Sequence, residues 1–157
     1  MTTKELKITY LEYSSSDELE AADRELCQAA IEAIDGAYAI YSHFCVGAAV
    51  RLSDGSIVKG ANQENAAYPS GLCAERTAMF AAGAMYPGLD MVSIAIAARQ
   101  NGVLCPEPAA PCGACRQVMA QYQTKAGKPM SILLVCSSAI RKFSRVDDLL
   151  PMMFNNI

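Results

Sequence analysis

The sequence has no excess of basic residues, and charged residues of either sign are few. Its 157 residues contain 13 lysines and arginines against 16 aspartates and glutamates, so the formal net charge is −3. This balance argues against a protein that holds nucleic acid or an anionic membrane mainly through charge. Hydrophobic residues make up 52% of the chain and charged residues 18%, a composition that excludes disorder, collagen-like repeats and coiled coils. A small neutral molecule is compatible with it as a substrate.

The chain also lacks long apolar runs. No run approaches the roughly 18–20 residues that a membrane-spanning helix needs, and residues 1–7 contain no apolar stretch of signal-peptide length. We therefore expect a cytoplasmic protein with no membrane contact. Cytosolic thiols stay reduced, and seven cysteines are an odd number for a disulfide framework. Metal binding or catalysis is the better explanation for at least some of them.

The length suits one domain. We expect residues 1–15, which are polar and irregular, to form an N-terminal lead-in or a short extra element, and residues 16–157 to form the single domain. Apolar spacing, caps and turn residues predict helices at about 16–36, 73–82 and 112–123, strands at 44–52, 56–61, 91–98 and 131–136, and a helical turn at 147–150. The strand–helix–strand order after residue 91 implies a parallel pair beside an antiparallel hairpin. We expect an α/β fold with one mixed sheet covered by helices.

Two short cysteine motifs carry the chemistry of the sequence. The first, Cys-Ala-Glu, spans residues 73–75, and the second, Pro-Cys-Gly-Ala-Cys, spans residues 111–115. Each stands at the predicted start of a helix, where unpaired backbone N–H groups favour a thiolate. Cys112 and Cys115 are three residues apart, so their sulfurs fall on the same side of the first helical turn.

Three thiolates around one point suit zinc, which prefers sulfur and nitrogen ligands in a tetrahedron. We expect Cys73, Cys112 and Cys115 to bind one zinc ion. Neither motif offers a fourth ligand, and His43, the only histidine, lies in a different motif. Three ligands leave an open position for water, as in catalytic zinc sites. Glu75 can take a proton from such a water and pass it to a leaving group.

Taken alone, the Cys-x-x-Cys pair at 112–115 is also typical of a thioredoxin-like redox site or of half of a structural zinc knot. The redox interpretation has no use for Cys73 or Glu75, and this favours zinc catalysis. A non-catalytic zinc-binding protein is the alternative from a different class. It predicts a filled fourth metal position and no need for Glu75.

The two motifs, continued over residues 73–78 (CAERTA) and 111–117 (PCGACRQ), resemble those of the zinc-dependent nucleoside and base deaminases. Residues 41–49 (YSHFCVGAA) resemble the first strand of cytidine deaminases, residues 62–69 (NQENAAYP) resemble their nucleoside-binding loop, and residues 148–151 (DLLP) also match. Together the matching segments span about residues 38–154, and they resemble the small, three-cysteine type of cytidine deaminase. One departure is Cys45, which stands where the family usually has proline.

The resemblance implies a three-layer α-β-α fold with a mixed five-stranded sheet, one zinc ion per subunit, and a homotetramer with active sites shared between subunits. It implies hydrolytic deamination of cytidine and 2'-deoxycytidine to uridine and 2'-deoxyuridine, with release of ammonia, in pyrimidine salvage. Glu75 would be the proton shuttle. The implied substrate-binding residues are Phe44, Asn62, Glu64, Tyr68, the backbone groups of Ala74 and Ala110, and Phe154, which would stack on a neighbouring subunit's pyrimidine. Without the resemblance, Phe44 and Phe154 would be interpreted as packing residues, and Asn62 and Glu64 as turn residues.

Three thiolates and one Zn²⁺ sum to a charge of −1, which would weaken the metal as a Lewis acid. Arg76 directly follows Glu75, and Arg116 directly follows Cys115. We expect these arginines, with the two helix N-termini, to offset the charge. The alternative for both is a solvated position on a helix.

Two related activities are alternatives. One is deamination of another cytosine compound, such as a nucleoside antibiotic, which residues 62–65 (NQEN) disfavour because they suit an ordinary ribose. The other is editing of RNA or DNA, which the acidic charge and the lack of basic stripes disfavour. We therefore expect a nucleoside substrate and no nucleic-acid partner.

Overall fold

The structure, a computed structural model, describes residues 1–155 and is built on one sheet. Its strands are β1 (Leu11–Tyr13), β2 (Phe44–Leu52), β3 (Ile57–Ala61), β4 (Met91–Gln100), β5 (Val103–Leu104), β6 (Ser131–Val135) and β7 (Ile140–Phe143). Its helices are α1 (Ala21–Ala33), α2 (Ala74–Met85) and α3 (Gly113–Ala126), and the 3-10 turns are η1 (Ser16–Glu18), η2 (Ile34–Gly36), η3 (Tyr68–Ser70) and η4 (Val146–Asp148). The strand order is β1-β7-β6-β4-β2-β3, with β5 paired to β4.

The expected mixed sheet is confirmed. β4 and β6 are parallel, with α3 in the connection between them, and the β2–β3 hairpin is antiparallel. The expected number of five strands is wrong, because the sheet has seven. Two of the seven, β1 and β5, have three and two residues, which is too short for an alternating apolar pattern. Both are held by pairing to a longer neighbour, β7 and β4 respectively.

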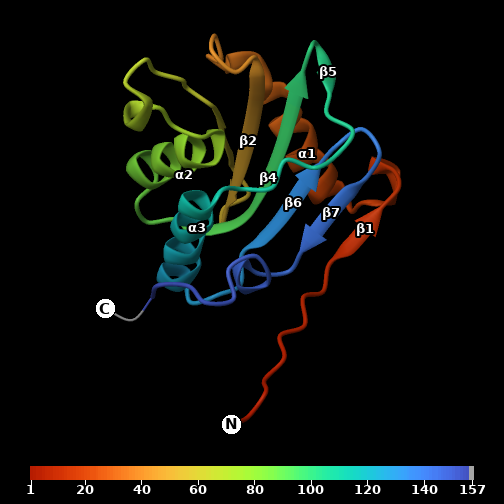
Figure 1. Cartoon of the computed structure of the whole chain (residues 1–157), viewed down its shortest axis with the longest axis vertical. Coiled ribbons are helices and arrows are strands. Elements are labelled where there is room, and N and C mark those ends of the chain that lie inside the picture. The colour runs from red at the N-terminus through yellow and green to blue at the C-terminus, as the bar shows by residue number, and fades with distance from the viewer. Residues whose placement is uncertain (156–157) are drawn as a thin grey trace.

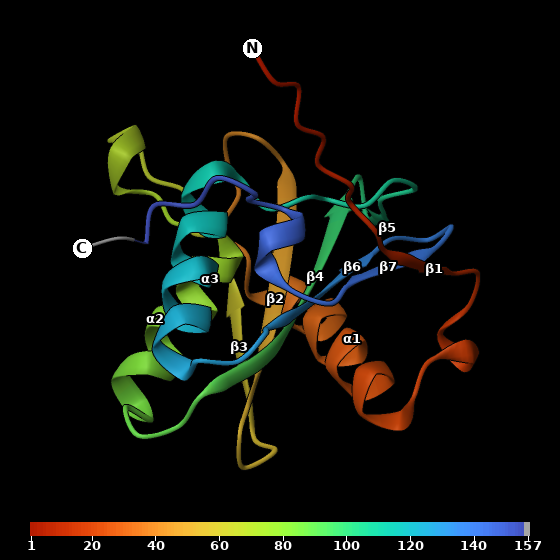
Figure 2. The same cartoon turned by 90° about the horizontal axis from the view of Figure 1, so that it is seen from below.

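Three layers are evident when the sheet is viewed along its edge (Figure 2). α2 and α3 lie together on one face, and α1 covers the other. Alternate side chains of the central strands supply the two cores: Val50 and Ile96 face α2 and α3, whereas Ala49 and Ala97 face α1. Gly47 lets α1 approach closely, because a Cβ there would lie 2.2 Å from the carbonyl oxygen of Ala30.

The predicted helices differ from the observed ones at their ends. The first begins at Ala21, not at Ser16, because the Arg24 guanidinium donates hydrogen bonds to the carbonyls of Ser16, Asp17 and Leu19 and so holds a separate turn there. The second continues past Gly83 to Met85. Gly83, a residue type that often ends helices, here lies inside α2 and leaves room for α3, since a Cβ there would lie 2.3 Å from the Tyr122 hydroxyl.

The N-terminal residues before β1 run away from the sheet as an extended segment (Figure 1). β1 itself pairs with β7 at the edge of the sheet. Within residues 1–155, no helix is both long enough and apolar enough to cross a membrane.

Candidate metal centre and active site

The two cysteine motifs meet where α2 and α3 begin. Cys73 is the residue before α2, Cys112 is the residue before α3, and Cys115 lies in the first turn of α3. Neither helix start has a side-chain cap, so the first N–H groups of each helix have no side-chain acceptor and remain available to an anion at that end. The three sulfurs lie within 4.8 Å of one another. The predicted cluster of three cysteines is therefore present in the folded chain.

The cluster fits zinc in both spacing and chemistry. The Sγ atoms of Cys73 and Cys112 are 3.9 Å apart, and those of Cys112 and Cys115 are 3.5 Å apart. Zn–S bonds of about 2.3 Å in a tetrahedron place sulfur ligands about 3.8 Å from one another. Among residues 1–155 this group contains no fourth histidine, cysteine or carboxylate ligand, and this matches a metal site with an open coordination position.

Electrostatics at the cluster favour a thiolate at Cys73. A hydrogen bond from the Cys115 thiol lowers the pKa of Cys73 to about 5 against the effect of burial, and Arg76 adds to the shift. The same hydrogen bond and burial raise the pKa of Cys115. Nη2 of Arg76 donates to Cys73 Sγ at 3.6 Å, and its Nε is buried without a partner in the described part of the chain. A positive charge thus lies against a sulfur that would carry a negative one.

Glu75 is a buried carboxyl group on the first turn of α2. The residue is only 5% exposed, and desolvation is the main cause that raises its pKa above the ordinary value. A carboxyl group whose pKa is raised by burial holds a proton more readily than an exposed one, which suits it to accept a proton and pass it on. Its position two residues after Cys73 places that capacity beside the three thiols.

A cavity of about 780 Å³ opens next to the cluster. It is lined by the beginning of β2, the loop after β3, the start of α2 and the segment before α3. Ten of the predicted site residues line it: Phe44, Asn62, Glu64, Tyr68, Cys73, Ala74, Glu75, Arg76, Ala110 and Cys112. Segments separated by more than 60 residues in sequence thus form one pocket with the metal cluster at one side.

Asn62 and Glu64 are tied to the segment that enters β2. The Asn62 side chain accepts from the Val46 N–H at 2.8 Å and donates to the Phe44 carbonyl at 2.9 Å. Glu64 Oε2 accepts from the N–H groups of Tyr41 at 2.8 Å and Ser42 at 3.3 Å. Both side chains therefore have fixed directions, and both line the cavity.

Three predicted residues do not line this cavity: Cys115, Arg116 and Phe154. Cys115 is fully buried behind it. The Arg116 guanidinium donates to the carbonyls of Pro111 and Leu149, each at 2.7 Å, so its hydrogen bonds go to backbone oxygens and not to sulfur. Phe154 is 68% exposed.

Sequence reasoning missed two residues that hold predicted ones in place. The Gln117 amide donates to the Phe154 carbonyl at 2.6 Å and accepts its N–H at 3.2 Å. Ser42 Oγ accepts the N–H of Phe44 at 3.0 Å. Both residues stand inside segments that resemble the deaminases, and this was the only available signal, because polar residues of this kind are common on surfaces.

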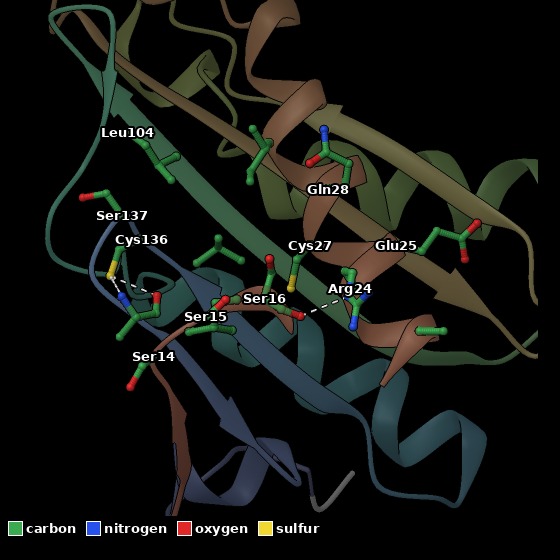
Figure 3. A pocket seen from close by; sticks show the side chains of 15 residues that line it. Ser14, Ser15, Ser16, Arg24, Glu25, Cys27, Gln28, Leu104, Cys136 and Ser137 are labelled. Atoms are coloured by element: carbon green, nitrogen blue, oxygen red, sulfur yellow. Dashed lines mark hydrogen bonds between the residues drawn. The ribbon is translucent and has the colours of Figure 1, made fainter. Parts of the chain in front are cut away.

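A second hollow lies on the opposite, α1-covered side of the sheet (Figure 3). Its lining includes Ser14–Ser16, residues of α1 and the turn between β6 and β7. Its charged groups are engaged in contacts of the fold. Arg24 binds the backbone of the η1 region, and Glu25 pairs with Arg51 at 2.7 Å. None of the predicted site residues lies there.

Known proteins are similar to this chain in sequence, and the similar region includes the cysteine motifs of the cluster. Residues 20–128 match the family described as the cytidine and deoxycytidylate deaminase zinc-binding region. The chain is 50% identical over 100 residues to a cytidine deaminase of Halalkalibacterium halodurans, a match that covers 63% of this chain and 71% of the relative.

Solved structures extend the similarity to most of the fold. A cytidine deaminase from Burkholderia pseudomallei superposes with a TM-score of 0.69 at 41% identity, covering 83% of this chain and 97% of the other. One from Mycobacterium tuberculosis superposes with a TM-score of 0.68 at 31% identity, covering 87% and 100%. The chain therefore belongs to the cytidine and deoxycytidylate deaminase family.

Proposed function

We propose that the protein hydrolytically deaminates cytidine and 2'-deoxycytidine to uridine and 2'-deoxyuridine and releases ammonia. One observation carries this proposal. A single cavity is lined by two cysteines of the three-thiol metal cluster, by a buried carboxyl group and by two oriented polar side chains. The similar proteins named above are cytidine deaminases, and the zinc-binding region of the family spans the cysteine motifs.

Cys73, Cys112 and Cys115 would hold a zinc ion, and bound zinc would supply a Lewis acid that makes an attacking water a better nucleophile near neutral pH. Glu75 accepts the proton that this water loses on attacking C4 of the base. It delivers that proton to ring N3, then takes the remaining proton of the new hydroxyl group at C4 and passes it to the amine, so that the C4–N bond breaks, ammonia leaves and a carbonyl remains at C4. Burial suits Glu75 to this role, because it raises the pKa of the carboxyl group.

The remaining pocket residues hold the nucleoside. Asn62 and Glu64 hydrogen-bond the ribose hydroxyl groups, and Phe44 packs near the sugar and the ring. The Ala74 N–H and the Ala110 carbonyl bind the oxygen and the exocyclic amine of the base. Tyr68, which is 92% exposed at the rim, completes the pocket across a subunit boundary.

Arg76 offsets the negative charge of the thiolate cluster, as its contact with Cys73 supports. Arg116 follows Cys115 and adds positive charge at the start of α3, while its hydrogen bonds join that helix start to the segment after η4. Its contacts thus favour an anchoring role in addition to the electrostatic one.

We also propose that four chains assemble and share their active sites. Phe154 supports this, because its backbone is held by Gln117 while its ring is exposed and lies outside its own pocket. We also propose a cytoplasmic location, because all seven cysteines are free thiols and reduced thiols suit the cytosol. A role in pyrimidine salvage follows from the proposed conversion of cytidine to uridine.

The test is the ultraviolet absorbance of cytidine incubated with the purified protein, with and without prior treatment by a zinc chelator. We expect conversion to uridine that the chelator abolishes and added zinc restores. Absence of conversion by protein shown to contain one zinc per chain would overturn the proposed activity.

A further inference from the structure

A short turn in front of β2 is held against Glu64 by a small set of hydrogen bonds. Oε2 of Glu64 accepts from two successive backbone N–H groups, those of Tyr41 at 2.8 Å and Ser42 at 3.3 Å. Ser42 Oγ in turn accepts the N–H of Phe44 at 3.0 Å. Ser42 therefore forms hydrogen bonds with both Glu64 and Phe44, and all three residues line the cavity.

The backbone of this turn has an unusual conformation that supports those contacts. His43 has a φ of 55°, in the left-handed region that non-glycine residues rarely adopt. Its N–H donates to the Ala39 carbonyl at 3.0 Å and closes the turn. A strained residue next to a binding pocket persists when the surrounding contacts hold it. Beside the bond from His43 to Ala39, the hydrogen bonds of the adjacent Ser42 to Glu64 and to Phe44 hold the turn.

The Ser42 hydroxyl oxygen accepts the N–H of Phe44. This bond does not use the hydroxyl proton, which therefore remains available for donation. A hydrogen bond from Ser42 is the largest cause that holds the pKa of Glu64 below its ordinary value, followed by the Tyr41 N–H. The charged neighbour that contributes is His43, which also lowers the pKa of Glu64. Glu64 is thus kept ionised and oriented by its neighbours in the turn.

We propose that Ser42 is a positioning residue for sugar recognition, because its backbone N–H donates to the Glu64 carboxylate while its hydroxyl oxygen accepts the N–H of Phe44. This inference rests on the proposed function, in which Glu64 and Phe44 contact the nucleoside. Ser42 acts through these two residues, so its removal weakens substrate binding and leaves the proton transfers of Glu75 intact.

The first experiment compares Ser42→Ala, which removes the hydroxyl, with Ser42→Thr, which keeps it. We expect KM for cytidine to rise about tenfold in Ser42→Ala with kcat within about twofold of wild type, and Ser42→Thr to restore most of the loss. Ser137→Ala, at an exposed serine of the β6–β7 turn far from the cavity, is the matched control. Equal losses of kcat and kcat/KM, or no change in KM, would overturn the proposal.

A double-mutant cycle tests whether Ser42 acts through Glu64. In a Glu64→Ala background, Ser42→Ala should add less than twofold to KM, because the carboxylate that it positions is already absent. Effects that multiply in full would mean that Ser42 acts independently of Glu64, against the proposal.

A third measurement does not depend on turnover. A carbon-13 NMR titration of the Glu64 carboxyl group should show a higher pKa in Ser42→Ala than in wild type and a return in Ser42→Thr. An unchanged pKa in Ser42→Ala would overturn the link between the two residues. Failure of the wild-type protein to deaminate cytidine would overturn the proposed function, and this titration would still decide whether Ser42 positions Glu64.

Discussion

Glu75 is the residue on which proton transfer depends. Glu75→Gln keeps the size of the side chain and removes its ability to carry a proton, so we expect turnover of cytidine to fall by at least about 10²–10⁴-fold. Zinc content should not change, because Glu75 is not part of the three-cysteine cluster. Initial rates and atomic absorption on the same sample measure both quantities. Turnover close to wild type would rule out the shuttle.

Arg76 tests the electrostatics of the cluster. Its guanidinium lies 3.6 Å from Cys73 Sγ, so Arg76→Ala should retain some zinc and lose most activity, by about tenfold or more. Arg141→Ala is the control, since Arg141 lies on edge strand β7 and pairs with Glu12 at 2.6 Å. The two variants are compared by turnover and by zinc stoichiometry. Unchanged turnover in Arg76→Ala would refute its role.

At the scale of elements, the site depends on how closely α2 packs on β3. A Cβ at Gly60 of β3 would lie 2.3 Å from the backbone nitrogen of Ala78 and 2.9 Å from the carbonyl of Ala74. Gly60→Ala must therefore push α2 away from the sheet, which we expect to lower the free energy of unfolding by about 1–3 kcal/mol. Zinc affinity should fall with it, because Cys73 moves with α2.

Gly88→Ala is the control for that substitution, because a Cβ there meets nothing within 4 Å. Urea unfolding and a competitive zinc titration of both variants provide the measurement. If Gly60→Ala unfolded at the same urea concentration as Gly88→Ala, the close contact of α2 with β3 would not be structurally important.

At the scale of the whole molecule, we expect four chains of 16.8 kDa in sedimentation experiments. Phe154→Ala should raise KM about tenfold if the ring stacks on a neighbour's pyrimidine. Co-assembly of Phe154→Ala chains with inactive Glu75→Gln chains provides a sharper result. The mixed assembly should regain a low KM, because Glu75→Gln chains supply Phe154 to the pockets that retain Glu75. A KM that stays high in mixed assemblies would place Phe154 in its own chain's site or outside any site.

Stability at high pH should depend on Cys27, which lies between α1 and the sheet and is 3% exposed. Burial, with a smaller effect of Asp23, raises the pKa of Cys27 from 9.0 to about 12. A thiol whose pKa is raised on folding stabilises the fold below pH 9, and this contribution is lost as the pH rises toward 12. The stability of wild type relative to Cys27→Ala should therefore decline over this range in urea unfolding. A constant difference would contradict it.

Short-range spacing made the central chemistry predictable. Cys112 and Cys115 meet because three residues span most of a helical turn, and Glu75 follows Cys73 by two residues, so their proximity is local. The parallel pairing of β4 and β6 followed from the order of strand, helix and strand. The strand bounds 44–52 were also correct, because the run is long and apolar.

The features that the sequence alone did not determine depend on contacts with other elements of the fold, most of them distant in sequence. β1 and β5 exist because a neighbouring strand offers hydrogen-bonding groups, and Gly83 continues α2 because Tyr122 of α3 packs over it. The Arg116 guanidinium lies against the carbonyl of Leu149, 33 residues away, and Ser42 lies against Glu64. A short motif specifies which chemical groups are present and how near neighbours are spaced. The direction of a long side chain is set by the partners that folding brings to it, and only the tertiary structure supplies these.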